Sequence, residues 1–276
     1  MPVVNASEQE LSELVRAARD GDGRALEHLL RALSDAIYGV CLRMTGSPPD
    51  AEDATQEVLI KVATRLGGFR GDAAVGTWAY RIAVNHLLDR RRSAIEALGL
   101  DFDRFAADLQ EGQQSPRADF EPMLAEEVKL GCTLAMLTCL DRQHRIAYVL
   151  GEVFDLPPAL AAQIAGTTQP AHRQRLSRAR RQIEAFTQSY CGVVNPAAPC
   201  SCDRRVARAL ELGRIKRDRL VLASPEQQRT QDSVRQMERL HDAAALFRSH
   251  PQYRAPERIV QTLSAALTSG LLQIPD

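Results

Sequence analysis

The sequence has few aromatic residues, a single tryptophan and no long hydrophobic run. Aromatic residues make up 5% of the chain. No apolar run approaches the ~18 residues that a membrane-spanning helix needs. The opening MPVVNASEQE is polar and acidic, where a signal peptide would be basic and then apolar. We therefore expect no membrane contact and a cytoplasmic location.

The sequence also lacks an excess of charge of one sign, since 35 basic residues balance 35 acidic ones. The charges are nevertheless segregated along the chain. Residues 81–93 carry four Arg against one Asp, and residues 171–185 carry five Arg against one Glu. Residues 99–122 carry six acids against two Arg. The two basic blocks are compatible with nucleic-acid binding even though the net charge is zero.

Strand-like alternation of apolar and polar residues is missing throughout, and helical spacing is common. Ser7 and Glu10 fit a capping box before a first helix. Apolar stripes predict three more helices before residue 93 and further helices after residue 122. The fold class is therefore expected to be all-α. We expect two small helical domains joined by an acidic linker, followed by a helical C-terminal extension. The boundaries are 1–97, 98–121, 122–188 and 189–276.

The end of the second domain has the pattern of a helix-turn-helix. Pro157 and Pro170 suit the first turns of two helices, and residues 166–168 form the short turn between them. In the second helix, expected over 170–183, the apolar residues share one face and leave a cationic face outward. Arg and Gln side chains can bind base edges in the DNA major groove, while other Arg neutralise phosphates. The candidate DNA-binding residues are Arg173, Gln174, Arg175, Ser177, Arg178 and Arg181. A merely solvated Arg-rich face is the alternative, which the preceding helix and turn disfavour.

A second basic helix, expected over 77–92, follows a glycine-rich loop at 67–76. Aromatic and amide side chains beside a cationic strip suit unstacked, single-stranded bases. Core packing is the simpler explanation for Trp78. The candidate DNA-binding residues here are Arg81, Asn85, Arg90 and Arg91.

These patterns resemble the extracytoplasmic-function type of RNA polymerase sigma factor over residues 8–188. Region 2 of that family is similar to DAEDATQEVLIKVATRLGGFRG and TWAYRIAVNHLLDRRR, at residues 50–71 and 77–92. Region 4 is similar to the segment 140–180, which begins LDRQHRIAYVLGEVF and ends with the helix-turn-helix. The resemblance implies a subunit of RNA polymerase that directs promoter-specific transcription initiation and is not an enzyme.

The resemblance also implies partners and roles. Core RNA polymerase would be contacted through its β′ clamp helices and β flap. The candidate polymerase-docking residues on the acidic helix are Asp53, Gln56, Glu57 and Lys61; a solvated helix face is the alternative for Asp53 and Glu57. The loop 67–76 and helix 77–92 would melt and hold the minus-ten promoter element. Helix 170–183 would bind the minus-thirty-five element, and the linker would thread the polymerase interior.

The chain departs from this family in continuing to Asp276. Cys191, Cys200 and Cys202 have Cys-x8-Cys-x-Cys spacing without an obvious fourth ligand, whereas structural zinc usually has four ligands. Plain packing, a redox-sensitive thiol group and a zinc site completed by His241 or His250 remain open, with no metal or cofactor as the expectation. Helices are expected from Ser224 and over 256–269. The extension can regulate the sigma domains intramolecularly or bind a partner such as an anti-sigma factor.

Two other functions compete with the sigma interpretation. A helix-turn-helix regulator that is not a polymerase subunit would explain residues 122–188 but not the pattern at 50–92. An enzyme would need a catalytic set, but the sequence has no glycine-rich phosphate loop or His-Glu-x-x-His pattern. We therefore expect a non-enzymatic protein.

Overall fold

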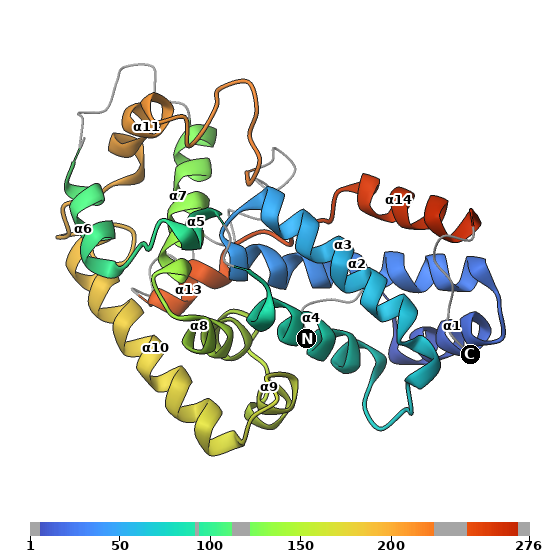
Figure 1. Ribbon diagram of the computed structural model, residues 1–276. Coiled ribbons are helices and arrows are strands. Elements are labelled where there is room, and N and C mark those ends of the chain that lie inside the picture. The colour runs from blue at the N-terminus through green and yellow to red at the C-terminus, as the bar shows by residue number, and fades with distance from the viewer. Residues whose placement is uncertain (1–5, 92–93, 112–121, 224–241, 270–276) are drawn as a thin grey trace.

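The computed structural model describes residues 6–91, 94–111, 122–223 and 242–269 (Figure 1). Within these ranges the chain is all-α, as predicted, and its only β-type pairings are two isolated bridges. Among the described helices, none combines the length and apolar character that crossing a bilayer requires.

The first unit contains four helices, which are α1 (Glu8–Arg19), α2 (Gly23–Thr45), α3 (Pro48–Thr64) and α4 (Val75–Asp89). The predicted capping box is present, with Ser7 Oγ accepting from Glu10 N and Glu10 Oε2 accepting from Ser7 N. Gly46 ends α2 in the left-handed conformation at φ 69°, which favours glycine. The short helix η1 (Leu66–Gly68) opens the loop before α4. The helix expected over 77–92 ends at Asp89, three residues earlier than predicted. Arg90 and Arg91 follow it in extended backbone or coil.

The short helix α5 (Ala94–Ala97) follows α4 at the end of the predicted first domain, and the described part of the predicted linker, 98–121, contains the helix α6 (Phe102–Gln110). The acidic composition expected of the linker is accompanied by an apolar face on α6. Its residues Phe105 and Leu109 are buried, and the Phe105 ring stacks on Phe186 at 5.4 Å between centroids. The segment is therefore attached to the second unit.

The second unit contains α7 (Pro122–Thr138), α8 (Arg142–Tyr148), the π-helical turn η2 (Val149–Val153), α9 (Pro158–Ile164) and α10 (Gln169–Tyr190). Helices α9 and α10 form the predicted helix-turn-helix. Gly166, at φ 61°, lies in the turn, and Thr168 caps α10 by accepting from Ala171 N at 3.3 Å. Helix α10 is longer than expected and extends to Tyr190.

The two units pack directly on one another, which the sequence pattern does not predict. One continuous apolar core includes residues of both units, and α9 lies against α4. The Tyr80 ring of α4 meets Phe154 edge-on at 6.3 Å. The two units therefore form one closed body, which contains both basic helices.

The C-terminal extension contacts both units through three helices. Helix α11 (Cys202–Glu211) packs on α7, α13 (Ala243–Arg248) packs on η2 and α10, and α14 (Glu257–Thr268) lies along α2 and α3 (Figure 1). Helix α14 fits the expectation for 256–269. The helix expected from Ser224 falls in residues 224–241, which are outside the described ranges.

Candidate DNA-binding and polymerase-binding surfaces

Helix α10 presents a cationic face to solvent. Its apolar side packs inward through Ala179, Ile183 and Phe186, all buried as predicted. The predicted contact residues lie on the other side. Arg173, Gln174, Arg178 and Arg181 are exposed, while Arg175 and Ser177 are half-buried. Arg181 Nη1 donates to Ser177 Oγ at 3.1 Å. The face therefore has the donors that base edges and phosphates accept.

Arg180 is the exception among the arginines of this helix. Its Nε donates to Glu152 Oε1 at 3.0 Å, and this carboxylate holds the pKa of Arg180 above its ordinary value. Gly151 lets α10 approach η2 closely, because a Cβ there would lie 2.6 Å from Leu176 Cδ2. Glu152 and Gly151 together fix the rotation of α10 and so the direction of its cationic face.

The face of α4 carries the second set of predicted DNA contacts. Arg81 and Asn85 are exposed. Arg91 is also exposed, but Arg90 is half-buried and its Nη1 donates to Asp50 O at 2.9 Å. Trp78 is half-buried and packs on Phe69, with ring centroids 5.1 Å apart. The structural contacts of Trp78 and Arg90 leave Arg81, Asn85 and Arg91 as the accessible members.

Helix α3 carries the predicted polymerase-docking residues. Asp53 and Glu57 are exposed, whereas Gln56 and Lys61 are half-buried. Lys61 Nζ lies 2.7 Å from His86 Nδ1, and Glu57 Oε2 lies 3.5 Å from His86 Nε2. Burial, and then the neighbouring Lys61, lower the pKa of His86. His86 therefore connects the acidic helix to α4, a role that sequence reasoning missed.

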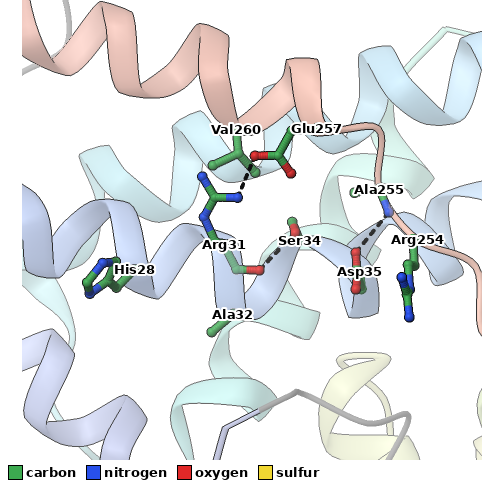
Figure 2. Close-up of a pocket in the computed structure, with 9 residues that line it drawn as sticks. All are labelled: His28, Arg31, Ala32, Ser34, Asp35, Arg254, Ala255, Glu257 and Val260. Carbon is green, nitrogen blue, oxygen red and sulfur yellow. Dashed lines mark hydrogen bonds and ion pairs between the residues drawn. The ribbon is translucent and has the colours of Figure 1, made fainter.

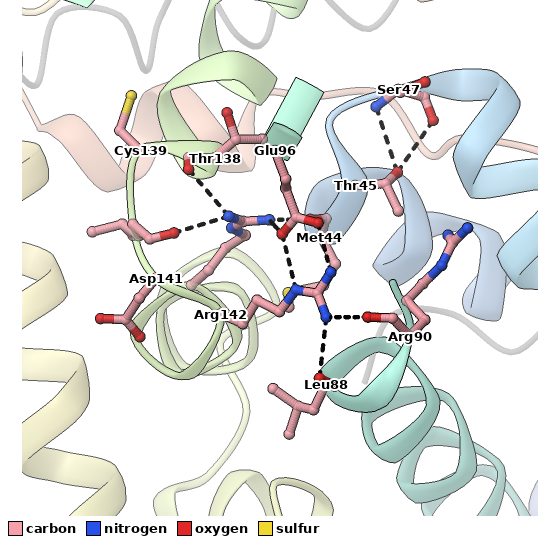
Figure 3. A network of polar contacts seen from close by, with 12 residues as sticks. Met44, Thr45, Ser47, Leu88, Arg90, Glu96, Thr138, Cys139, Asp141 and Arg142 are labelled. Carbon is pink, nitrogen blue, oxygen red and sulfur yellow. Dashed lines mark hydrogen bonds and ion pairs between the residues drawn. The ribbon is translucent and has the colours of Figure 1, made fainter. Parts of the chain in front are cut away.

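A buried ionic cluster lies between the two units, around Glu96 (Figure 3). Arg142 binds this carboxylate with two hydrogen bonds, Nε to Oε1 at 3.0 Å and Nη2 to Oε2 at 2.7 Å. Arg142 Nη1 also donates to the carbonyls of Leu88 and Arg90 at the end of α4. Arg145 joins from the same helix, α8, and donates to Met44 O at the end of α2. The cluster thus joins the second unit to both α2 and α4.

Helix α14 is attached beside the acidic helix by charged contacts. Arg258 pairs with Glu52 of α3, and Arg31 Nη1 lies 2.5 Å from Glu257 Oε1. Asp35 Oδ1 accepts from Ala255 N at 2.9 Å. Arg31, Asp35, Ala255 and Glu257 line a hollow of about 410 Å³ between α2 and the start of α14 (Figure 2). The contacts hold the end of the extension next to the predicted docking surface.

The candidate metal ligands form no metal site within the described residues. His250 makes two buried side-chain hydrogen bonds, one with Thr133 Oγ1 and one with Tyr253 OH, and so belongs to the core. His241 lies outside the described residues. In the part of the chain that the structure describes, no three His, Cys, Asp or Glu side chains are arranged around one point as metal ligands.

A cationic helix-turn-helix, a second basic helix and an exposed acidic helix are together typical of an all-α transcription protein. The Sigma-70 region 2 family model matches residues 29–95. The RNA polymerase sigma-H factor of Pseudomonas aeruginosa is 30% identical over 190 residues, which cover 66% of this chain and 96% of that protein. The ECF RNA polymerase sigma-E factor of Escherichia coli is 30% identical over 182 residues, covering 63% and 93%.

A further relative is the ECF RNA polymerase sigma factor SigE of Mycolicibacterium smegmatis, 31% identical over 174 residues, which cover 60% of this chain and 64% of that protein. The chain belongs to the extracytoplasmic-function (ECF) family of RNA polymerase sigma factors. The resemblance found in the sequence is thereby confirmed. A helix-turn-helix regulator that is not a polymerase subunit is not favoured, because it would not explain the region 2 match.

Proposed function

We propose that this chain is a sigma subunit that binds core RNA polymerase and directs promoter-specific transcription initiation, without being an enzyme itself. The observation that carries the proposal is the presence of the region 2 match at 29–95 and an exposed cationic helix-turn-helix in one chain. The first accounts for polymerase docking and the second for binding of duplex DNA.

Recognition of the minus-thirty-five element is assigned to α10. Arg173, Gln174 and Arg178 project from the first half of a helix whose opposite side is fixed in the core. A helix held in this way can enter the major groove, where Arg pairs with guanine and Gln with adenine by two hydrogen bonds. Arg181 lies nearer the middle of α10 and suits a phosphate contact.

Recognition of the minus-ten element is assigned to α4 and the loop before it. Arg81 and Asn85 lie one helical turn apart on the exposed side of α4. An amide and a guanidinium at this spacing can hold an unstacked base and its phosphate. Arg91 extends the same cationic strip.

Polymerase docking is assigned to the exposed side of α3, with the β′ clamp helices as the partner. Asp53 and Glu57 are four residues apart and give this face an acidic edge that suits a helix carrying basic residues. The second unit would contact the β flap. Asp53→Lys tests the docking assignment, because charge reversal at an exposed edge lowers association without removing a buried contact.

The closed arrangement is a resting form that must open before both promoter elements are bound. The two elements are ~25 base pairs apart, which at ~3.4 Å per base pair is ~85 Å. A compact chain of 276 residues has a radius of gyration of about 19 Å and so spans roughly 50 Å. The closed body is too short to reach both elements at once, so α4 and α10 must separate on the polymerase.

The extension supports this closed form because it contacts both units. Helix α14 lies on α2 and α3, while α11 and α13 lie on the second unit. These contacts favour intramolecular regulation by residues 189–276 over an extension that only recruits an anti-sigma factor. Arg258 of α14 pairs with Glu52, the residue before Asp53, so we infer that α14 limits access of the polymerase to α3.

Reconstitution with core RNA polymerase on genomic DNA fragments tests the sigma function. We expect transcripts with defined start sites that core polymerase alone does not make. The Asp53→Lys chain should give fewer transcripts at limiting sigma concentration. If neither the full chain nor a chain with the Arg31–Glu257 contact broken gives defined starts, the proposed function is wrong.

A further inference from the structure

A buried arginine lies where the two units and the extension meet. Arg43 belongs to the last turn of α2, and only 7% of it is exposed. Its Cζ lies 5.2 Å from the centroid of the Phe154 ring, which belongs to the second unit. The distance from the same atom to the centroid of the Tyr253 ring, which belongs to the extension, is 5.1 Å. The guanidinium therefore lies against one aromatic ring from each of the other two parts of the chain.

Within the described residues, no carboxylate compensates the charge of Arg43. Its Nη1 donates to Gly39 O, one turn earlier in α2, at 3.0 Å. Its Nε is buried and has no hydrogen-bond acceptor among these residues. Arg145 is similarly buried, but it pairs with Glu96. Because arginine stays protonated in proteins, the closed chain buries a positive charge that aromatic rings and one carbonyl alone surround.

The two rings offset only part of the cost of this burial. A guanidinium is attracted to the face of an aromatic ring, because the ring carries negative charge there. Removing an unpaired cation from water nevertheless costs more free energy than such contacts return. Both rings belong to parts of the chain that would move away from α2 on opening. Hydration of Arg43 therefore favours the open form.

Tyr253 lies at the point where the extension passes from the second unit to the first. Before it, α13 packs on η2 and α10. After it, Ala255 N donates to Asp35 Oδ1 of α2 at 2.9 Å (Figure 2). Tyr253 itself is 8% exposed, and its hydroxyl forms a hydrogen bond with His250 Nδ1 at 3.1 Å. The Tyr253 ring is thus held over Arg43 only while the extension lies across both units.

We propose that Arg43 is a built-in destabilising charge that sets the balance between the closed and open forms, and that Tyr253 makes this balance depend on the extension. With the extension in place, the rings of Tyr253 and Phe154 shield the guanidinium, and the closed form prevails. When Tyr253 leaves, water replaces its ring, and the hydrated charge favours separation of α2 from Phe154. The inference rests on the proposed opening of the chain, and it names the residue through which the extension controls that opening.

This role predicts the opposite of what a simple latch predicts. If Arg43 were a latch, its loss would open the chain. Arg43→Met removes the charge and keeps a long apolar side chain, so the closed form should be retained or favoured. Tyr253→Leu keeps the apolar burial but removes the ring while the charge remains. This variant should raise the ratio of open to closed chains roughly fivefold, as expected for the loss of one cation–π contact.

Energy transfer between two fluorescent labels measures the opening on the full-length chain alone. The labels are attached at Asp89 of α4 and Gln182 of α10, which are both exposed. Tyr253→Leu should lower the transfer, and adding Arg43→Met to it should restore the wild-type value. Adding Arg43→Lys instead keeps the charge, so the chain should stay open. Circular dichroism verifies that each variant is folded.

Tyr253→Phe is the matched control, because it removes the hydroxyl that bonds to His250 but keeps the ring over Arg43. Its energy transfer should equal that of the wild type. An open Arg43→Met chain would overturn the proposal, since Arg43 would then be a latch. Unchanged transfer in folded Tyr253→Leu would overturn it too, as would equal transfer in the two double variants.

Binding to core RNA polymerase separates this switch from the proposed function. Arg43→Met should bind core polymerase more weakly than the wild type, because more of the chain is closed and must open first. The label measurements need no polymerase. If they follow the predicted order while the chain supports no defined transcription starts, the switch stands and the sigma function is wrong. If defined starts are made but the label order is reversed, the sigma function stands and the switch is wrong.

Discussion

Glu96 accepts a hydrogen bond from Arg145 Nη1 at 2.8 Å, although the two residues belong to different units of the chain. Arg145 is almost fully buried, with 3% of its side chain exposed, and the Glu96 side chain is 9% exposed. Arg145 also donates to the carbonyls of Thr138 and Leu140 at the end of α7. A single carboxylate after α4 therefore compensates the charge of a guanidinium in the core of the second unit.

Replacing Glu96 with alanine should destabilise the closed chain. The change leaves Arg142 and Arg145 without their carboxylate, and removal of one partner from a buried ion pair costs roughly 3–5 kcal/mol. Urea unfolding followed by circular dichroism measures the free energy of unfolding. Glu211→Ala is the control, because Glu211 and its partner Arg208 are much more exposed and such pairs contribute less than about 1 kcal/mol. Equal losses in the two variants would contradict the role of Glu96.

His250 should make the stability depend on pH in the mildly acidic range. Burial, and then Arg43 and Lys129, lower the pKa of His250 well below its ordinary value. The unfolded chain, with a histidine pKa of about 6.5, therefore binds a proton that the folded chain does not. The free energy of unfolding is therefore unaffected by His250 above about pH 6.5. Below that pH it falls by up to about 1.4 kcal/mol per pH unit because of this group.

Urea unfolding at pH 7.5, 6.5 and 5.5 tests this dependence. His86 and His172 have pKa values lowered in the same direction and add to the loss. His250→Gln should therefore reduce the slope without abolishing it, while His28→Gln, at an exposed position, should leave it unchanged. A His250→Gln slope equal to that of the wild type would show that His250 is not a source of the dependence.

The helices could be predicted because their signals are local. The capping box at Ser7, the helix-turn-helix around Gly166 and the buried face of α10 depend on residues a few positions apart. Such patterns follow from helical periodicity and capping alone. The exposed candidates Asp53, Asn85 and Arg178 likewise follow from the opposite face of an amphipathic helix.

The contacts between units could not be predicted because they join residues far apart in the sequence. Nothing local to Glu96 indicates that it pairs with Arg142 and Arg145. The acidic composition around α6 hid an apolar face that becomes evident only against Phe186.

Arg178 and Arg180 should differ in their effect on DNA binding. Arg178 is exposed, whereas Arg180 is engaged by Glu152. Arg178→Ala should lower the affinity of the polymerase holoenzyme for duplex DNA carrying the minus-thirty-five element. Loss of a base contact costs ~1–3 kcal/mol and relaxes specificity. Loss of a phosphate contact instead weakens binding about equally on all sequences and reduces the salt dependence of the affinity. Arg180→Ala is the matched control and should have the smaller effect. Fluorescence anisotropy at several salt concentrations measures both, and equal losses would reject the assigned orientation of α10.

Reversing the charge at the contact between α14 and α2 should open the chain. Glu257→Arg places a cation beside Arg31, with which Glu257 now pairs at 2.5 Å. Repulsion at this solvent-exposed seam should release α14 with only a small change in overall stability, because exposed ion pairs contribute little. Fluorescent labels on α3 and α14 should report a longer separation, and core RNA polymerase should bind the variant more tightly than the wild type.

The double variant Arg31→Glu, Glu257→Arg provides the matched control for this charge reversal. It restores an attractive pair with the signs exchanged, so the label separation and the polymerase affinity should return toward wild-type values. The single variant Glu257→Gln removes attraction without adding repulsion and should fall between the two. If Glu257→Arg lengthens the separation but polymerase affinity does not change, α14 does not limit access to α3. If the separation itself is unchanged, this contact does not hold the extension in place.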